Sequence, residues 1–228
     1  MYDQLTGELV WQIDTDGYEI DPDAEPKRLN ADQLGAEFYR DAGVDAYYSR
    51  RGMVRRVGGP LRDYKPMVDE PGLAWALADL FPIDGRSHGP DDAGIINFVE
   101  HFGLLIRGDE MPVRDLLYTA KYLSVFASAV RREEMYAARD LFNQRVLPRM
   151  TVKLVGSATG ALTANWSLDV EPVDLISAAW LQMAKALTGG KDMKKCAAPD
   201  CIKWFPDREN KRFCNNRCKM AFHRARRK

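Results

Sequence analysis

All four cysteines of the chain lie in its last 33 residues, in two closely spaced pairs. Cys196 and Cys201 form the run CAAPDC, Cys214 and Cys218 form the run CNNRC, and twelve residues separate the pairs. Two close pairs of thiols joined by a short connector are typical of a tetrahedral metal site, because each pair supplies two ligands from one tight turn. We therefore expect these four residues to bind one zinc ion.

The ligand count predicts the role of the metal. Four protein ligands leave no open coordination position, so the zinc is expected to be structural and not catalytic. An alternative ligand is His223, which lies five residues after Cys218 and would give a site of three Cys and one His. A redox role for the cysteines is disfavoured, because neither pair has the two-residue spacing of a CxxC motif.

Charge is distributed unevenly along the chain. Residues 191–228 contain thirteen Lys or Arg and four Asp or Glu, and since the whole chain has 33 of each kind, the first 190 residues carry an acidic excess of nine. A basic end on an acidic body indicates a polyanionic partner. We expect this partner to be nucleic acid, most simply DNA, and the candidate contact residues to be Lys203, Lys211, Arg212, Arg217, Lys219, Arg224, Arg226 and Arg227.

The chain after the last cysteine reads KMAFHRARRK, and we expect a helix that begins at Cys218. A basic helix can lie on phosphates or enter a major groove, whereas a frayed basic terminus gains only nonspecific, salt-dependent affinity. A function of another class is a protein interaction module, in which the zinc site is a structural staple that docks on a partner or on the acidic body. In either case, we expect Trp204, Phe205 and Phe213 to pack around the site.

Other groups of reactive or charged residues are weaker candidates. Arg50, Arg51, Arg55 and Arg56, beside Tyr47 and Tyr48, could grip a phosphate backbone, although a solvated strand and turn is the simpler interpretation. The loop with Asp84, His88, Asp91 and Asp92 has no fixed ligand spacing, and a lone His101 is more typical of a boundary residue. With no paired nucleophile and base, phosphate loop or open metal site, we do not expect an enzyme.

The hydrophobic pattern predicts a mainly helical α+β protein. Apolar residues recur at helical spacing in residues 70–147 and 172–188, and their alternation predicts a β-hairpin near 151–168. The pair Gly189 and Gly190 marks a boundary between a body, residues 1–190, and a zinc-binding end, residues 191–228. The chain has no run of about eighteen apolar residues, and its first residues lack the order of a secretory signal. We therefore expect a cytoplasmic protein with no membrane partner. The sequence is compatible with a homo-oligomer.

The cysteine-rich end resembles a known class of zinc finger. The positions of Cys196, Cys201, Phe205, Asp207, Arg212, Phe213, Cys214 and Cys218, with the basic end, are similar to the CGNR-type treble-clef finger and to the FCSxxCR-type ribbons of bacterial and phage proteins. Here CNNR starts at the third cysteine, where the family signature starts at the fourth. The resemblance implies a treble-clef ribbon that binds DNA, following a helical, ABATE-like domain of stress-induced transcription regulators.

Overall fold

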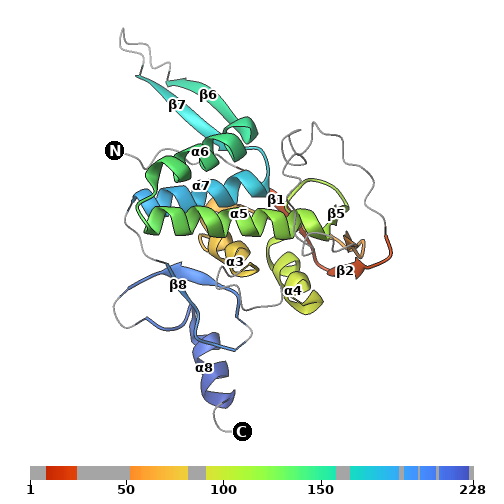
Figure 1. The fold of residues 1–228 in the computed structure, drawn as a ribbon. Helices are drawn as coiled ribbons and strands as arrows, with labels where there is room; N and C mark the ends of the chain where they lie inside the picture. The colour runs from red at the N-terminus through yellow and green to blue at the C-terminus, as the bar shows by residue number, and fades with distance from the viewer. Residues whose placement is uncertain are drawn as a thin grey trace.

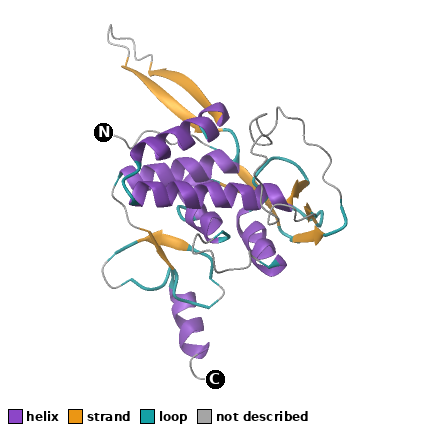
Figure 2. Cartoon of the chain, viewed as in Figure 1, coloured by secondary structure: helices purple, strands orange, loops and turns teal. Residues whose placement is uncertain are grey.

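The protein is a mixture of helices and small antiparallel sheets, seen here in a computed structural model (Figure 1). This architecture agrees with the expected α+β class, and the helices gather at the centre with the strands around them (Figure 2). The structure describes residues 9–24, 52–81, 91–157, 165–189, 193–199, 201–208 and 211–225. In this part of the chain, no helix is long and apolar enough to cross a membrane.

Helices α3, α5 and α7 pack against one another and form the centre of the molecule. Apolar residues at helical spacing give each of them a buried face, as the sequence predicted. The fully buried side chains Trp180, Phe98 and Leu123 belong to one continuous core, in which the Trp180 and Phe126 ring centroids are 5.2 Å apart. The helices of the body are α2 (Pro66–Asp69), α3 (Leu73–Asp79), α4 (Asp92–Phe102), α5 (Val113–Arg131), α6 (Met135–Arg145), the 3-10 turn η3 (Leu147–Arg149) and α7 (Leu175–Thr188).

Helix α7 has well-defined ends. The Asp174 carboxylate accepts a hydrogen bond from the backbone N–H of Ser177 at 2.8 Å, and the Ser177 hydroxyl accepts one from the Asp174 N–H. This capping box satisfies two N–H groups that the first turn would leave unpaired. At the other end the N–H of Gly189 donates to the carbonyl of Lys185, so the helix stops next to the glycine pair.

Small antiparallel sheets flank the helical body. β1 pairs with β4, β2 with β3, β3 with β5, and β6 with β7, all antiparallel. The β6–β7 hairpin projects from one side of the body (Figure 1). The strands are β1 (Trp11–Asp14), β2 (Tyr18–Asp21), β3 (Met53–Arg56), β4 (Leu61–Tyr64), β5 (Glu110–Pro112), β6 (Met150–Ser157) and β7 (Asn165–Pro172).

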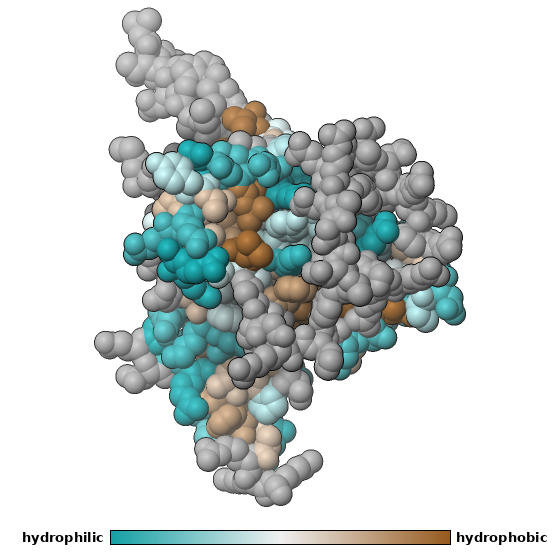
Figure 3. Space-filling model, in the orientation of Figure 1, coloured by the Kyte–Doolittle hydropathy of each residue, from teal (hydrophilic) through white to brown (hydrophobic). Residues whose placement is uncertain are grey.

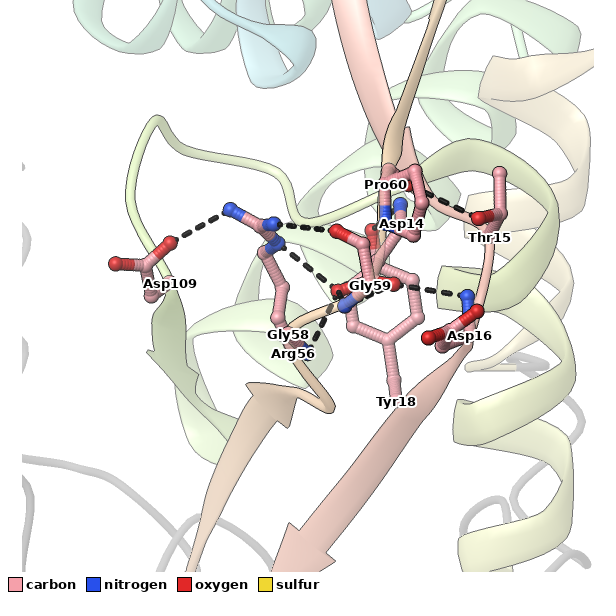
Figure 4. A network of polar contacts seen from close by, with 9 residues as sticks. All are labelled: Asp14, Thr15, Asp16, Tyr18, Arg56, Gly58, Gly59, Pro60 and Asp109. Atoms are coloured by element: carbon pink, nitrogen blue, oxygen red, sulfur yellow. Dashed lines mark hydrogen bonds and ion pairs between the residues drawn. The ribbon is translucent and has the colours of Figure 1, made fainter.

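Two of these small sheets are tied together by the buried carboxylate of Asp14 (Figure 4). It accepts hydrogen bonds from the backbone N–H groups of Gly58, at 3.0 Å, and Gly59, at 3.1 Å, and from Arg56 Nε at 3.2 Å. Burial alone would raise the pKa of Asp14, but the hydrogen bonds from the Asp16 and Gly58 N–H groups, with Arg56, lower it overall. The carboxylate therefore acts as a structural anchor between the turn after β1 and the turn after β3.

The C-terminal part, residues 193–225, forms a separate small unit that we call the finger. It lies on the side of the body opposite the β6–β7 hairpin (Figure 1). An antiparallel pair, β8 (Met193–Lys195) with β9 (Trp204–Pro206), leads to helix α8 (Asn216–Ala225), which extends away from the body. The finger has few buried apolar side chains of its own, so its stability must come from another source.

Candidate metal centre

The four cysteine side chains converge on one point in the finger. Their Sγ atoms all lie within 4.8 Å of one another, with 3.8 Å between Cys201 and Cys214, 3.7 Å between Cys218 and Cys201, and 3.4 Å between Cys214 and Cys218. None of the four forms a disulfide. Since zinc–sulfur bonds of about 2.3 Å in a tetrahedron place sulfurs about 3.8 Å apart, the donor set fits one tetrahedral metal ion.

Backbone hydrogen bonds hold the first cysteine pair in place. The N–H of Cys196 donates to the carbonyl of Lys203, which continues the β8–β9 pairing, and the N–H of Ala197 donates to the carbonyl of Arg212. The N–H of Cys201 donates to the carbonyl of Ala198, closing a tight turn between the two cysteines. The wide four-residue spacing of CAAPDC is therefore accommodated by one turn, as the sequence predicted.

The second pair is positioned by the start of α8. The N–H of Cys218 donates to the Asn215 side-chain oxygen at 2.9 Å, and the N–H of Lys219 donates to the Asn215 carbonyl. Asn215 thus caps the helix, which begins at Asn216, two residues before the expected start at Cys218. Cys218 consequently lies in the first turn, facing Cys214.

Burial and neighbouring groups shift the thiol pKa values of Cys196, Cys201 and Cys214. Burial raises the pKa of Cys201 to about 11, and the neighbouring thiols Cys196 and Cys218 contribute to the rise. Burial and the neighbouring thiols also raise the pKa of Cys214. The pKa of Cys196 is lowered instead, because hydrogen bonds from the Ala198 and Cys214 N–H groups outweigh the effect of burial. A divalent metal held by these four residues would lower the thiol pKa values, because it would stabilise every thiolate that it bound.

A small apolar cluster supports the centre. Phe205 is buried in one cluster with Cys196, Phe213 packs against this cluster, and the Phe213 and Phe222 ring centroids lie 5.2 Å apart. Lys211 lies over the Phe205 ring at 4.9 Å, and Arg212 lies over Phe222 at 5.7 Å, as in cation–π contacts. Two of the three aromatic residues expected around the site are therefore present there.

The expectation that the third aromatic residue, Trp204, packs around the cysteines is wrong. It precedes Phe205 on strand β9, so its side chain points to the opposite face, and it packs with Ile202 against the core of the body. At its carbonyl the chain passes very close to Gly72, where a Cβ atom would lie 2.3 Å from the Trp204 oxygen. Only glycine allows this approach, so Gly72 and Trp204 define where the finger meets helix α3.

Two ion pairs join the finger to the body at the same face. Lys203 Nζ lies 2.8 Å from Glu70 Oε1, and Lys195 Nζ lies 2.5 Å from Asp79 Oδ2. Glu70 also lies 3.2 Å from His101 Nε2, which places His101 at a structural boundary. Burial raises the pKa of Glu70, but the contacts with His101 and Lys203 outweigh it and lower the pKa overall. The acidic body therefore binds part of the basic end directly.

The remaining basic residues of the expected set lie on or near α8. Arg217, Lys219 and Arg224 are exposed, and within the part of the chain that the structure describes they form no ion pair. Arg226 and Arg227 lie outside the described residues. The alternative ligand His223 is exposed on α8, and the metal-binding group found among the described residues contains the four cysteines without it.

The other candidates from the sequence have structural partners or cannot be placed. Arg55 pairs with Asp21 and Glu110, while Arg56 pairs with Asp14 and Asp109, so both arginines hold the small sheets together. The Asp91 side chain caps α4 by accepting from the Gly94 N–H. Tyr47, Tyr48, Arg50, Arg51, Asp84 and His88 lie outside the described residues.

No protein-family model and no curated protein matches this chain. The similarity to the CGNR-type finger therefore rests on the residues that carry it. What the geometry establishes is a cluster of four cysteines positioned to bind one metal ion, in a small unit docked on an acidic, mainly helical body.

Proposed function

We propose that this protein binds one zinc ion through Cys196, Cys201, Cys214 and Cys218, and that the zinc is structural. The observation that carries the proposal is the set of Sγ separations, which matches the edges of a tetrahedron of thiolates. Four sulfur ligands fill the coordination shell, which supports a role without catalysis at the metal. A thiolate site also suits a unit whose own apolar cluster is this small.

We further propose that the zinc finger presents α8 to nucleic acid, most simply duplex DNA. The helix has ten residues, none of them buried, and an α-helix with its side chains is about 10 to 12 Å in diameter, which fits a major groove about 12 Å wide. Its exposed cations are Arg217, Lys219 and Arg224. The docked cations Lys195 and Lys203 are already paired with carboxylates, so we assign the phosphate contacts to α8 and not to the whole basic end.

A titration of DNA binding tests this proposal. The zinc-loaded full chain is titrated onto a labelled duplex at several salt concentrations, and compared with the triple variant Arg217→Ala, Lys219→Ala, Arg224→Ala. If each residue contacts a phosphate, the variant binds roughly tenfold or more weakly, and the slope of log K against log salt falls by about 2 to 3.

The matched control removes three exposed cations from the body, Arg62, Arg132 and Arg139. Both variants lose the same formal charge, so a general electrostatic effect would weaken them equally. The proposal requires the α8 variant to lose much more affinity than the control. Equal losses, or no saturable binding by the wild-type chain, would refute a nucleic-acid role for α8.

A second candidate function is a protein interaction module in which the finger is a structural staple. The observation that favours it is the docked face, where Gly72, Glu70 and Asp79 of the body meet Trp204, Lys203 and Lys195 of the finger. Under this function, lysine labelling modifies Lys203 slowly and Lys219 quickly in the intact chain. Rapid labelling of both residues would mean that the finger does not stay docked.

A further inference from the structure

A cavity lies at the junction between the body and the finger. Its volume is about 230 Å³, and its walls come from α3, α5 and α7 of the body and from β9 of the finger. The body side is formed by Trp75, Ala127 and Met183, which are almost completely buried, and Trp204 closes the finger side. The cavity therefore has an apolar base and two aromatic walls, the usual lining of a small-molecule site.

A cationic side chain borders this cavity. Arg131 lies at the exposed edge and forms no ion pair within the described ranges. The acidic residue of the lining, Asp79, is already paired with Lys195. Among the described residues, the charged group of the lining that has no counter-ion is therefore the Arg131 guanidinium.

We propose that this cavity binds a small aromatic carboxylate, with its ring against Trp75 and Trp204 and its carboxylate bound by Arg131. An engineered cavity of about 150 Å³ holds a benzene molecule, so 230 Å³ has room for one ring and a carboxylate. The ligand joins the two parts of the molecule, because one wall belongs to the finger and the rest to the body.

The proposal is tested by titrating the zinc-loaded full chain with two probes of the same shape, benzoate and benzamide, with ligand-observed NMR as the readout. Benzoate is expected to bind about tenfold more tightly than benzamide, the effect of one charge-assisted hydrogen bond. In Arg131→Ala, benzoate affinity falls about tenfold to the level of benzamide, and benzamide affinity stays the same.

Arg132→Ala is the matched control, because Arg132 is the next residue, is equally cationic and pairs with Glu134 without lining the cavity. It is expected to bind both probes as the wild type does. Equal affinity for the two probes, an Arg132→Ala loss equal to that of Arg131→Ala, or no saturable binding at millimolar benzoate would overturn the proposal.

This site does not depend on the proposed nucleic-acid role of α8. The variant that lacks Arg217, Lys219 and Arg224 is expected to bind benzoate normally, since none of these residues lines the cavity. A chain that binds benzoate but not DNA would refute the nucleic-acid role alone. A chain that binds DNA but not benzoate would refute the ligand site alone.

Discussion

The body and the finger are stabilised by different means. The body buries a continuous core that runs from β1 through α3, α5 and α7, whereas the buried apolar cluster of the finger consists of Cys196, Ala198 and Phe205. All three helices that form the centre of the body contribute buried side chains, while α8 contributes none. The comparison teaches that hydrophobic burial specifies the body, and that the finger, on our proposal, depends on metal ligation instead.

The surface of the finger also has little apolar area. In the space-filling view, the lower part of the molecule, where Figure 1 places the finger, has hydrophilic residues around a small apolar area (Figure 3). On α8 the large exposed apolar residue is Met220, 56% accessible, which lies in the sequence between the cations Lys219 and Arg224. A helix so poor in buried side chains is stable only where its first turn is fixed, here by Asn215 and Cys218.

Removal of the metal should give the largest difference between the two parts. Structural zinc contributes roughly 10 to 16 kcal/mol of apparent binding free energy in small fingers, so a chelator should unfold residues 193–225 and leave the body folded. Amide hydrogen exchange is expected to become fast in α8 and to stay slow in α5 and α7. Cys214→Ala should behave like the chelated protein, and Met220→Ala, an exposed change in the same helix, like the zinc-loaded one. Protection of α8 in the metal-free chain would contradict this account.

A core substitution should produce the opposite pattern. Trp180 is 2% exposed and packs against Phe126, so Trp180→Ala is expected to destabilise the body by about 3 to 5 kcal/mol. Its zinc content should stay at one per chain, because the ligands lie in another unit. Thermal melts and metal analysis measure the two effects, with Tyr136→Ala, an aromatic residue that is 78% exposed, as the control. Loss of zinc in Trp180→Ala would mean that the finger cannot fold without the body.

The contact between the two parts should be sensitive to a single methyl group. Gly72→Ala places a Cβ against the Trp204 carbonyl and is expected to cost about 1 to 3 kcal/mol, by shifting the finger away from α3. The backbone φ of Gly72 is −97°, which alanine adopts without strain, so the effect reports the contact alone. The zinc content should not change, while the indole NMR signal of Trp204 should move. An unchanged Trp204 signal would show that the docked arrangement is not the one described here.

The smallest effect concerns the ion pair of Glu70 with Lys203. Because the pKa of Glu70 is lowered in the folded protein, its stabilising contribution is present above the unfolded pKa, near 4.5, and is lost as the pH falls through the folded value. Glu70→Gln is therefore expected to be about 1 kcal/mol less stable than the wild type at pH 7, with a difference that disappears on acidification. Urea melts of the two proteins across pH 3 to 7 measure it. A difference that grows at low pH would have the wrong sign.

The metal centre was the part of the molecule most open to prediction from sequence. The spacing of the four cysteines was enough to predict the cluster of Cys196, Cys201, Cys214 and Cys218. A tetrahedral metal ion constrains the positions of its ligands strongly, so few arrangements of four thiols can bind one. The helical periods of α5 and α7 were predictable for a similar reason, since a buried face forces apolar residues to recur. In both cases, a local rule is enough to determine the structure.

The contacts between the parts could not be predicted in this way. Trp204 and Phe205 are neighbours with similar side chains, and only the direction of strand β9 decides which one faces the metal and which one faces the body. The role of Gly72 could not be predicted from the sequence either, because it depends on contact with the Trp204 carbonyl, more than a hundred residues away along the chain. The partners of Arg55 and Arg56 are likewise set by strand pairing between distant segments.

The central claim is that one zinc ion, bound by four cysteine thiolates, holds the finger that presents α8. X-ray absorption spectroscopy of the zinc-loaded full chain tests it most directly, because it counts and identifies the atoms bound to the metal. The account predicts a first shell of four sulfur atoms at about 2.3 Å. A shell containing nitrogen or oxygen, as a site that used His223 would give, or a chain that retains no zinc after purification, would contradict it.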